Sequence, residues 1–201
     1  MLQVKKVVGG ILSSNMYILF EESSSDCWIV DIGDFHALKK ILPESACVKG
    51  LFLTHGHFDH IAGINDLLSV YPNMVVYTNE QGKEMLYSDK LNLSKYHEQP
   101  ITFKGDGDRI QLIKDGERIQ ISDKEEIMAI FTPGHNDSCI TYYNDRYIFT
   151  GDSYIEGVPV VTKLPGGNKA LAEVSLQKIQ QLCDERVLYT GHNVDSWVSV
   201  F

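Results

Sequence analysis

The sequence predicts an α+β fold, in which helices and strands are mixed within one domain. Short apolar runs bounded by Gly, Ser or Asp indicate strands in the beginning and middle of the chain, and runs with helical spacing interrupt them. A length of 201 residues is enough for one domain with its own hydrophobic core. Because neither a linker nor a low-complexity segment divides the chain, we expect residues 1–201 to form a single domain.

The strands are predicted from apolar runs, often β-branched, with turn residues between them. In the N-terminal part they span residues 4–8, 15–20, 28–31, 48–54 and 74–78. Asp34 is suited to cap a short helix that ends before Pro43, because its carboxylate can accept hydrogen bonds from the unpaired N–H groups of a helix start. Later strands are predicted at 127–131, 147–149 and 187–189.

Two segments with helical spacing and one irregular segment complete the prediction. Apolar residues recur at helical spacing from Ile61 to Tyr71, and residues 169–183 place their apolar side chains on one face that should pack on a sheet. Residues 80–108 are the least regular part of the chain. They form either a segment that covers the substrate or a surface insertion without substrate contact.

The composition argues against a nucleic-acid-binding surface and against a membrane span. The formal net charge is −9, and no stretch approaches the length of an apolar transmembrane helix. We therefore expect no nucleic-acid partner and no membrane partner. The cysteines form no Cys-x-x-Cys pair, so we expect reduced thiols and a cytoplasmic location.

A cluster of metal-type side chains follows the apolar run at residues 51–53. It reads Thr54-His55-Gly56-His57-Phe58-Asp59-His60, and zinc, iron and manganese prefer imidazole and carboxylate ligands. Three later strand-like runs also end at a threonine, followed by a turn and another potential ligand. The ends of these runs would bring enough ligands for two metal ions to one rim, namely His55, His57, Asp59, His60, His135, Asp152 and His192.

The spacing within the first cluster favours two separate ions. Side chains alternate along an extended loop, so His55 and His57 can bind the same ion. The adjacent Asp59 and His60 diverge unless the backbone turns, and the helical spacing that follows predicts such a turn. We therefore expect the first two histidines to serve one metal, and Asp59 with His60 to serve a second metal beside it.

Together these motifs resemble the metallo-β-lactamase-fold hydrolases, and among them the glyoxalase II-like (hydroxyacylglutathione hydrolase-like) branch. The resemblance extends from the run Asn15-Met16-Tyr17-Ile18-Leu19 to Gly191-His192. It implies a four-layer αββα sandwich, with the metal site at one edge of the β-sandwich.

The resemblance also implies a role for each of the seven side chains. The first metal would be bound by His55, His57 and His135. The second would be bound by Asp59, His60 and His192, and Asp152 would bridge the two ions. Asp31 falls where the family has an aspartate that orients a metal ligand by hydrogen bonding. The alternative is that Asp31 is only a turn residue in Asp-Ile-Gly-Asp.

The ligand set and the resemblance predict a metal-dependent hydrolase with a small-molecule substrate. Two divalent ions, zinc first and iron or manganese as alternatives, would share a bridging hydroxide that attacks a carbonyl carbon. The candidate catalytic residues are Asp152, which would hold the ions together, and Asp59, which would orient the hydroxide or accept its proton. A small thioester or activated ester suits this chemistry, because its leaving group needs little help from an acid.

Two departures from the family pattern affect the expected substrate. Ser138-Cys139 replaces the usual Gly-Ser near His135. The sequence ends nine residues after His192, where glyoxalase II enzymes continue into a helical domain that helps to hold glutathione. We therefore expect weak discrimination for glutathione over smaller thiols.

Three other interpretations stay open. One is a persulfide dioxygenase-like oxidoreductase, in which His55, His135 and Asp152 would hold a single iron. The others are a lactonase and a binding protein whose metal site has no turnover. Among the remaining candidates, His36 and His97 are expected to be ordinary exposed residues, and Cys139 to be a packing residue rather than a metal ligand.

Overall fold

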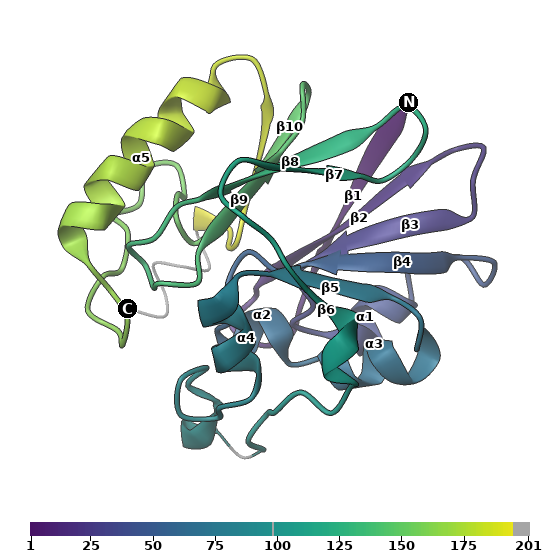
Figure 1. Cartoon of the computed structure of the whole chain (residues 1–201), viewed down its shortest axis with the longest axis horizontal. Coiled ribbons are helices and arrows are strands. Elements are labelled where there is room, and N and C mark those ends of the chain that lie inside the picture. The colour runs from purple at the N-terminus through teal and green to yellow at the C-terminus, as the bar shows by residue number, and fades with distance from the viewer. Residues whose placement is uncertain (98, 195–201) are drawn as a thin grey trace.

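The strands form two facing sheets within residues 1–97 and 99–194, which the computed structural model describes (Figure 1). The first sheet has the order β1-β2-β3-β4-β5-β6, and the second has the order β11-β10-β9-β8-β7. The strands of the first sheet are β1 (Leu2–Val8), β2 (Asn15–Glu21), β3 (Asp26–Val30), β4 (Cys47–Phe52), β5 (Val75–Thr78) and β6 (Ile110–Leu112). Those of the second are β7 (Glu117–Gln120), β8 (Glu126–Phe131), β9 (Ile140–Tyr143), β10 (Tyr147–Gly151) and β11 (Val187–Thr190).

Helices cover the outer faces of both sheets and complete the four-layer αββα sandwich expected from the sequence. The helices are α1 (Phe35–Lys39), α2 (Phe58–Ile61), α3 (Ile64–Val70), α4 (Glu80–Leu86) and α5 (Lys169–Cys183), with 3-10 turns η1 (Ser94–Tyr96) and η2 (Gly107–Arg109). Figure 1 shows α1 to α4 on one side of the first sheet and α5 against the far side of the second. No helix in the part of the chain that the structure describes is long and apolar enough to cross a membrane.

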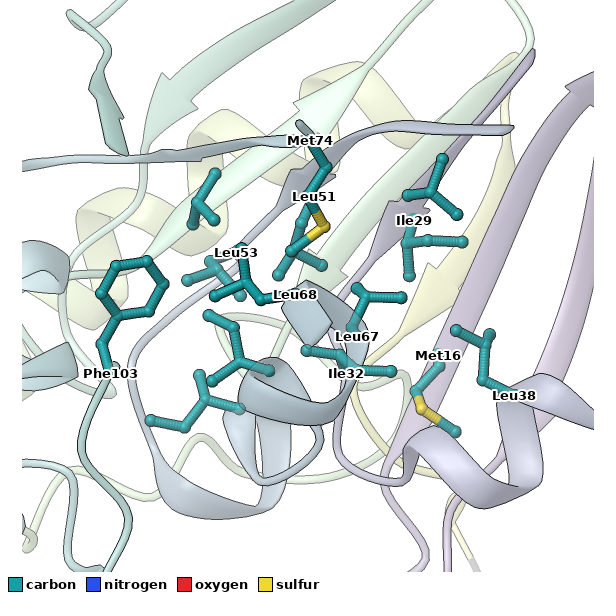
Figure 2. Packing of buried hydrophobic residues seen from close by; sticks show 14 of the residues in the cluster. Met16, Ile29, Ile32, Leu38, Leu51, Leu53, Leu67, Leu68, Met74 and Phe103 are labelled. Carbon is teal, nitrogen blue, oxygen red and sulfur yellow. The ribbon is translucent and has the colours of Figure 1, made fainter. Parts of the chain in front are cut away.

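The strands β2 and β3 inside the first sheet are buried on both faces, which explains their almost continuous apolar sequences. Successive residues of β2 point to opposite sides, so Met16 packs against the helices and Tyr17 packs between the sheets. Figure 2 shows the core between sheet and helices, where Leu51, Leu67 and Met74 lie together. The second core, between the sheets, is built from both inner faces and includes Tyr142 and Phe149.

The predicted strands are present, with ends that differ by one or two residues, and the predicted helix at 169–183 matches α5. The helix expected from Ile61 to Tyr71 is instead divided into α2 and α3. Gly63 interrupts it, because its N–H donates to the carbonyl of Ile32 (2.8 Å) and α1 begins so close that a Cβ on Gly63 would lie 2.6 Å from the backbone N of Phe35.

Among the described residues, the strands β6, β7 and β9, the helix α4 and the two 3-10 turns were not predicted. The helix α4 lies within residues 80–108, which the sequence analysis described only as the least regular part of the chain. Its first turn is capped by the side chain of Asn79, which accepts a hydrogen bond from the N–H of Gly82 (2.8 Å).

Asp34 joins α1 to the turn between β1 and β2, and it should contribute to stability in a pH-dependent way. Its carboxylate accepts hydrogen bonds from the N–H groups of Ala37 (2.9 Å) and Gly10 (3.0 Å). Burial raises the pKa of Asp34, but these backbone N–H groups outweigh burial and hold the pKa below its usual value. A lowered pKa in the folded state stabilises the protein above the pKa of the unfolded state, and this contribution is lost as the pH falls.

We predict that Asp34→Ala lowers the free energy of unfolding by about 1 kcal/mol at neutral pH. The difference from the unaltered protein should shrink below about pH 4, where the carboxylate becomes protonated. Urea denaturation at both pH values measures it. Asp34→Asn, which keeps a capping oxygen, should retain most of the stability. Equal stability of Asp34→Ala and the unaltered protein at neutral pH would contradict the prediction.

Candidate metal centre

All seven metal-type side chains predicted from the sequence lie together where loops leave the ends of β4, β8, β10 and β11. Each of them is buried, with at most 5% of its surface exposed. The seven are His55, His57, Asp59, His60, His135, Asp152 and His192. Within the described residues, every cluster of metal-type ligands is drawn from this set. Their role as ligands stays a prediction, and their convergence is a feature of the fold.

The first group is a triad of histidines. Nε2 of His55 lies 3.2 Å from Nδ1 of His57, and Nε2 of His135 lies 2.9 Å from the same Nδ1. His55 follows β4 and His135 follows β8, so the triad joins the two sheets. The sequence spacing alone placed His55 and His57 together, and the fold adds His135 to them.

The second group combines one carboxylate with two histidines. Nε2 of His192 lies 3.2 Å from Oδ2 of Asp59, and Nε2 of His60 lies 3.5 Å from the same oxygen. The two histidine Nε2 atoms are 3.3 Å apart. Asp59 and His60 can face one point because α2 begins at Phe58, which is the backbone turn that the sequence required.

Asp152 lies between the two groups. Its Oδ2 is 3.6 Å from Nε2 of His135 and 3.6 Å from Nε2 of His192. Its Oδ1 is 3.6 Å from Nε2 of His60. Oδ1 is buried and has no hydrogen-bond partner among the described residues. A buried carboxylate oxygen without a partner is costly, so its position indicates a cation as the missing partner.

The donor set fits divalent transition metals. Ligands held at about 2.0–2.1 Å in a tetrahedral arrangement are roughly 3.4 Å from one another. The separations within the two groups, 2.9–3.2 Å and 3.2–3.5 Å, are close to this value. Imidazole and carboxylate donors suit zinc, iron and manganese. The residues present therefore fit two ions side by side.

Backbone and side-chain oxygens orient the histidine rings. Nδ1–H of His135 donates to the carbonyl of Val161 (2.8 Å), and Nδ1–H of His192 donates to the carbonyl of Leu12 (3.1 Å). Both rings therefore turn Nε2 and its lone pair toward the cluster. His57 is the exception, because its Nδ1 faces the cluster. Such contacts select the tautomer that a metal requires.

Asp31 orients two parts of the site, so it is more than the turn residue that was the alternative interpretation. The carboxylate of Asp31 accepts hydrogen bonds from Nδ1–H of His60 (2.8 Å), from the backbone N–H of Thr54 (2.8 Å) and from the side-chain hydroxyl of Thr54 (2.7 Å). The hydroxyl oxygen of Thr54 then accepts from Nδ1–H of His55 (3.1 Å). Asp31 has a left-handed φ of 56°, a conformation that costs energy for a non-glycine residue.

Two glycines make room for Asp152. Gly151 has a left-handed φ of 52°, and a Cβ there would lie 2.4 Å from Oγ1 of Thr54. A Cβ on Gly191 would lie 2.0 Å from Oδ1 of Asp152. Gly191 therefore allows β11 to bring His192 beside Asp152, and a larger residue would displace the carboxylate.

Burial is the largest influence on the pKa values of His55 and His57. It lowers the pKa of His55 well below the usual value. It also lowers the pKa of His57, with the help of neighbouring His135, to about 3. Both imidazoles are therefore neutral at physiological pH and have a lone pair for a metal.

The second group behaves differently because carboxylates surround it. Burial lowers the pKa of His60, but Asp59, Asp152 and Asp31 outweigh it and raise the pKa to about 10. Burial raises the pKa of Asp59, but the neighbouring His60 and His192 hold it well below its usual range. In the metal-free protein His60 therefore has an additional proton at neutral pH, and Asp59 is ionised.

The site opens into a cavity of about 450 Å³. His57, Asp59, His135 and Asp152 contribute to its lining, and residues from the segment 80–108 form part of the wall. The segment therefore borders the site, as the first of the two interpretations of it required. The sequence offered no signal for the other wall residues, because they come from segments that are far apart in the chain.

The remaining candidates lie where the sequence analysis expected, with one addition. His36 is exposed on α1. His97 is exposed too, but it lines the cavity, and its ring lies 3.8 Å from that of Phe58 between centroids. Cys139 is buried, and burial raises the pKa of its thiol to about 12, so it is protonated and a poor nucleophile.

Comparison with known proteins agrees with this architecture. A hydroxyacylglutathione hydrolase from Erwinia tasmaniensis is 28% identical over 182 residues, which cover 90% of this chain. The chain spans only 62% of the length of that relative. The solved structure of BLEG-1, described as a B3 metallo-β-lactamase, superimposes with a TM-score of 0.86 at 26% sequence identity. The superposition covers 95% of this chain and 92% of the BLEG-1 chain.

A second solved structure, TTHA1623 in a di-iron-bound form, has a TM-score of 0.78 at 21% identity. It covers 94% of this chain and 92% of its own, and at this identity it demonstrates a shared fold only. The model of the metallo-beta-lactamase superfamily matches residues 13–192, a range that contains all seven candidate ligands. The chain therefore belongs to the metallo-β-lactamase superfamily.

Proposed function

We propose that this protein is a metal-dependent hydrolase that cleaves a small thioester or activated ester with two divalent ions. The observation that carries the proposal is the position of Asp152, whose Oδ2 lies 3.6 Å from a histidine nitrogen of each group. One carboxylate thus reaches both groups, as a bridging ligand must. The hydroxyacylglutathione named as the substrate of a relative is itself a thioester, which supports the reaction class.

The geometry supports a division of the seven side chains between two ions. His55, His57 and His135 would hold the first ion, because their three donor atoms face one another. The second ion would be held by Asp59, His60 and His192, and Asp152 would contact both. Bound there, divalent ions lower the pKa of a shared water molecule and polarise the substrate carbonyl.

Residues of the chain itself orient the candidate ligands and can accept a proton from the attacking water. Asp59 lines the cavity and is ionised, so it can accept a proton from the attacking water. Asp31 holds the ring of His60, and the carbonyl of Val161 holds that of His135, so these rings need no reorganisation during the reaction. A thiolate leaves easily, and the reaction therefore does not require a strong acid.

The ligand types indicate a divalent transition metal but do not select one metal among zinc, iron and manganese. We propose zinc first, since histidine and aspartate are common zinc ligands. Iron and manganese suit the same donors, and a protein of the same fold is described in a di-iron-bound form. Metal quantification on protein purified without added metal decides between them.

A second candidate is a mononuclear iron oxidoreductase of the persulfide dioxygenase type. The observation that favours it is that His55 and His135 both lie near Oδ2 of Asp152, at 3.9 Å and 3.6 Å. Two histidines and one carboxylate can bind a single iron with positions left open. Oxygen consumption with a persulfide, by protein that holds one iron per chain, would favour this candidate over the hydrolase.

The substrate class is tested with a panel of thioesters, lactones, other activated esters, a β-lactam and a persulfide. A β-lactam belongs in the panel because BLEG-1 is described as a metallo-β-lactamase. Thioester turnover that exceeds the other reactions supports the proposal. Turnover of the β-lactam or the persulfide alone would refute it, and selective lactone turnover would move the assignment to a lactonase.

We predict that Asp152→Ala lowers kcat/KM for a thioester by at least roughly a hundredfold, because it removes the ligand shared by both ions. Cys139→Ala should retain most of the activity, since the thiol of Cys139 is buried and protonated. Steady-state kinetics on metal-loaded proteins measure both effects. An inactive Cys139→Ala protein with normal metal content would show that the nucleophile is wrongly assigned.

We also predict that two ions bind per chain and that binding of the second ion displaces a proton from His60. His60 is protonated at neutral pH because its pKa is raised to about 10, whereas His55 and His57 are already neutral. The affinity for the second ion should therefore increase with pH up to about 10. Calorimetric zinc titration of metal-free protein, in buffers with different ionisation enthalpies, counts the released protons.

Two variants serve as test and control for this titration. His60→Ala should weaken the second site and remove its proton release, while the first site still binds. His36→Ala, a change of an exposed histidine outside the cluster, should leave both sites intact. Saturation of the unaltered protein at one ion per chain would refute the dinuclear mechanism.

A further inference from the structure

We propose that the wall of the active-site cavity binds an uncharged apolar group of the substrate, and that Leu93 helps to determine this specificity. The inference rests on the proposed function and narrows its substrate class. The preferred substrates would be thioesters or esters whose acyl or thiol group is aliphatic or aromatic. A thiol with several charges, such as glutathione, would be a poorer partner.

The cavity has two chemically distinct parts. One set of lining residues consists of potential metal ligands, including Asp59 and Asp152. The other set, here called the wall, consists of apolar and aromatic side chains from three separate loops, namely Leu12, Leu93, Tyr96, His97, Leu164 and Pro165. The described residues that line the cavity include neither lysine nor arginine. The carboxylates of a peptide thiol would need such cations for tight binding, whereas an apolar group needs only the wall.

The backbone at two wall leucines is strained. Leu12 has a φ of 47° and Leu93 a φ of 69°, both in the left-handed region that favours glycine or asparagine. A left-handed backbone is energetically unfavourable for leucine, and burial offsets little of this for Leu12, which is 37% exposed. Leucine at these positions is therefore unfavourable for folding but places apolar surface beside the candidate metal ligands.

The loop that carries Leu93 is held in place by hydrogen bonds and does not depend on substrate for its shape. The side chain of the buried Asn92 donates to the carbonyls of Met85 (3.0 Å) and Ile101 (2.9 Å) and accepts from the N–H of Ser94 (2.9 Å). The carbonyl of Asn92 accepts a hydrogen bond from the N–H of Phe58 (2.9 Å), in the helix that carries Asp59 and His60. The wall and the candidate metal ligands are thus joined through one residue.

Aromatic groups extend the wall to the mouth of the cavity. The ring of His97 lies against that of Phe58 at an interplanar angle of 30°. Tyr96, the next residue, is 74% exposed and also lines the cavity. A large aromatic side chain that is exposed at a site entrance is available for contact with an apolar ligand.

The first experiment compares an acyl pair that differs in apolar surface and a thiol pair that differs in both apolar surface and charge. On zinc-loaded protein, kcat/KM is measured for acetyl and hexanoyl thioesters of one small thiol, and for acetyl thioesters of glutathione and phenylmethanethiol. Full burial of one methylene is worth roughly a fourfold change, so partial burial of the longer chain should favour hexanoyl over acetyl by roughly tenfold. The thiol pair shows whether the wall holds the acyl group or the leaving group.

A matched pair of variants assigns the preference to the wall. Leu93→Asn keeps a residue that tolerates left-handed backbone and removes the apolar side chain, so it should fold and lower the apolar preference at least roughly threefold. Leu91→Asn changes an exposed leucine two residues earlier that does not line the cavity, and it should leave the preference unchanged. Thermal unfolding of both variants confirms that they are folded.

A binding measurement separates this inference from the proposed hydrolysis. Hexanoate and acetate, and phenylmethanethiol and 2-mercaptoethanol, are titrated calorimetrically into zinc-loaded protein and into the Leu93→Asn variant. We expect the more apolar member of at least one pair to bind more tightly, with a negative change in heat capacity, and the variant to lose this difference. That result supports an apolar wall even if no thioester is hydrolysed, in which case only the proposed function fails.

The opposite results overturn the inference. If thioesters are hydrolysed but acetyl and glutathione substrates are preferred, the proposed function stands and the apolar wall does not determine specificity. Equal affinity within both ligand pairs would also overturn the inference. A preference for the apolar ligand that persists in Leu93→Asn would overturn it too.

Discussion

The position of the Asp152 carboxylate is the constraint on which the site depends. β10 ends at Gly151, which has a left-handed backbone and lies directly against the side chain of Thr54. Because Gly191 has no side chain, the end of β11 can lie beside the Asp152 carboxylate. The N–H of Gly191 donates to the carbonyl of Gly151 (2.8 Å), so the parallel pairing of β10 and β11 continues up to the site. Two small residues and one strand pair thereby place a single carboxylate within reach of histidines from both groups.

The packing of the two sheets explains why distant parts of the chain meet there. β4 belongs to the first sheet, whereas β8, β10 and β11 belong to the second, and apolar side chains fill the space between them. At the edge near the site, the N–H of Ile140 donates to the carbonyl of Thr54 (2.8 Å), which links the sheets by their backbones next to His55. The hydrophobic core therefore sets the separation of the histidines in the first group. Hydrogen bonds set the orientation of the rings: His135 donates to Val161, His60 to Asp31 and His192 to Leu12.

Much of the fold and the convergence of the seven side chains could be predicted, because each ligand follows an apolar strand and strand ends meet at sheet edges. The missed elements lack that signal. β7 reads Glu-Arg-Ile-Gln, with only Ile119 buried, as suits an edge strand. α4 contains Gly82, which weakens a helix, yet a Cβ there would lie 2.0 Å from Oγ1 of Thr78. Of the cavity wall, only the contribution of residues 80–108 was anticipated, as one of two alternatives. The rest could not be predicted, because contacts among separate loops leave no periodic pattern.

The contact between Leu12 and His192 has a consequence for the order in which the site forms during synthesis. Nδ1–H of His192 donates to the carbonyl of Leu12, and residues 14 and 192 form an isolated β-bridge. A chain emerging from the ribosome contains the first histidine triad once residue 135 is made, but it lacks His192 until nearly 60 further residues follow. The turn after β1 therefore gains its contact with His192 only late in synthesis, and the two groups of candidate ligands are completed at different stages of translation.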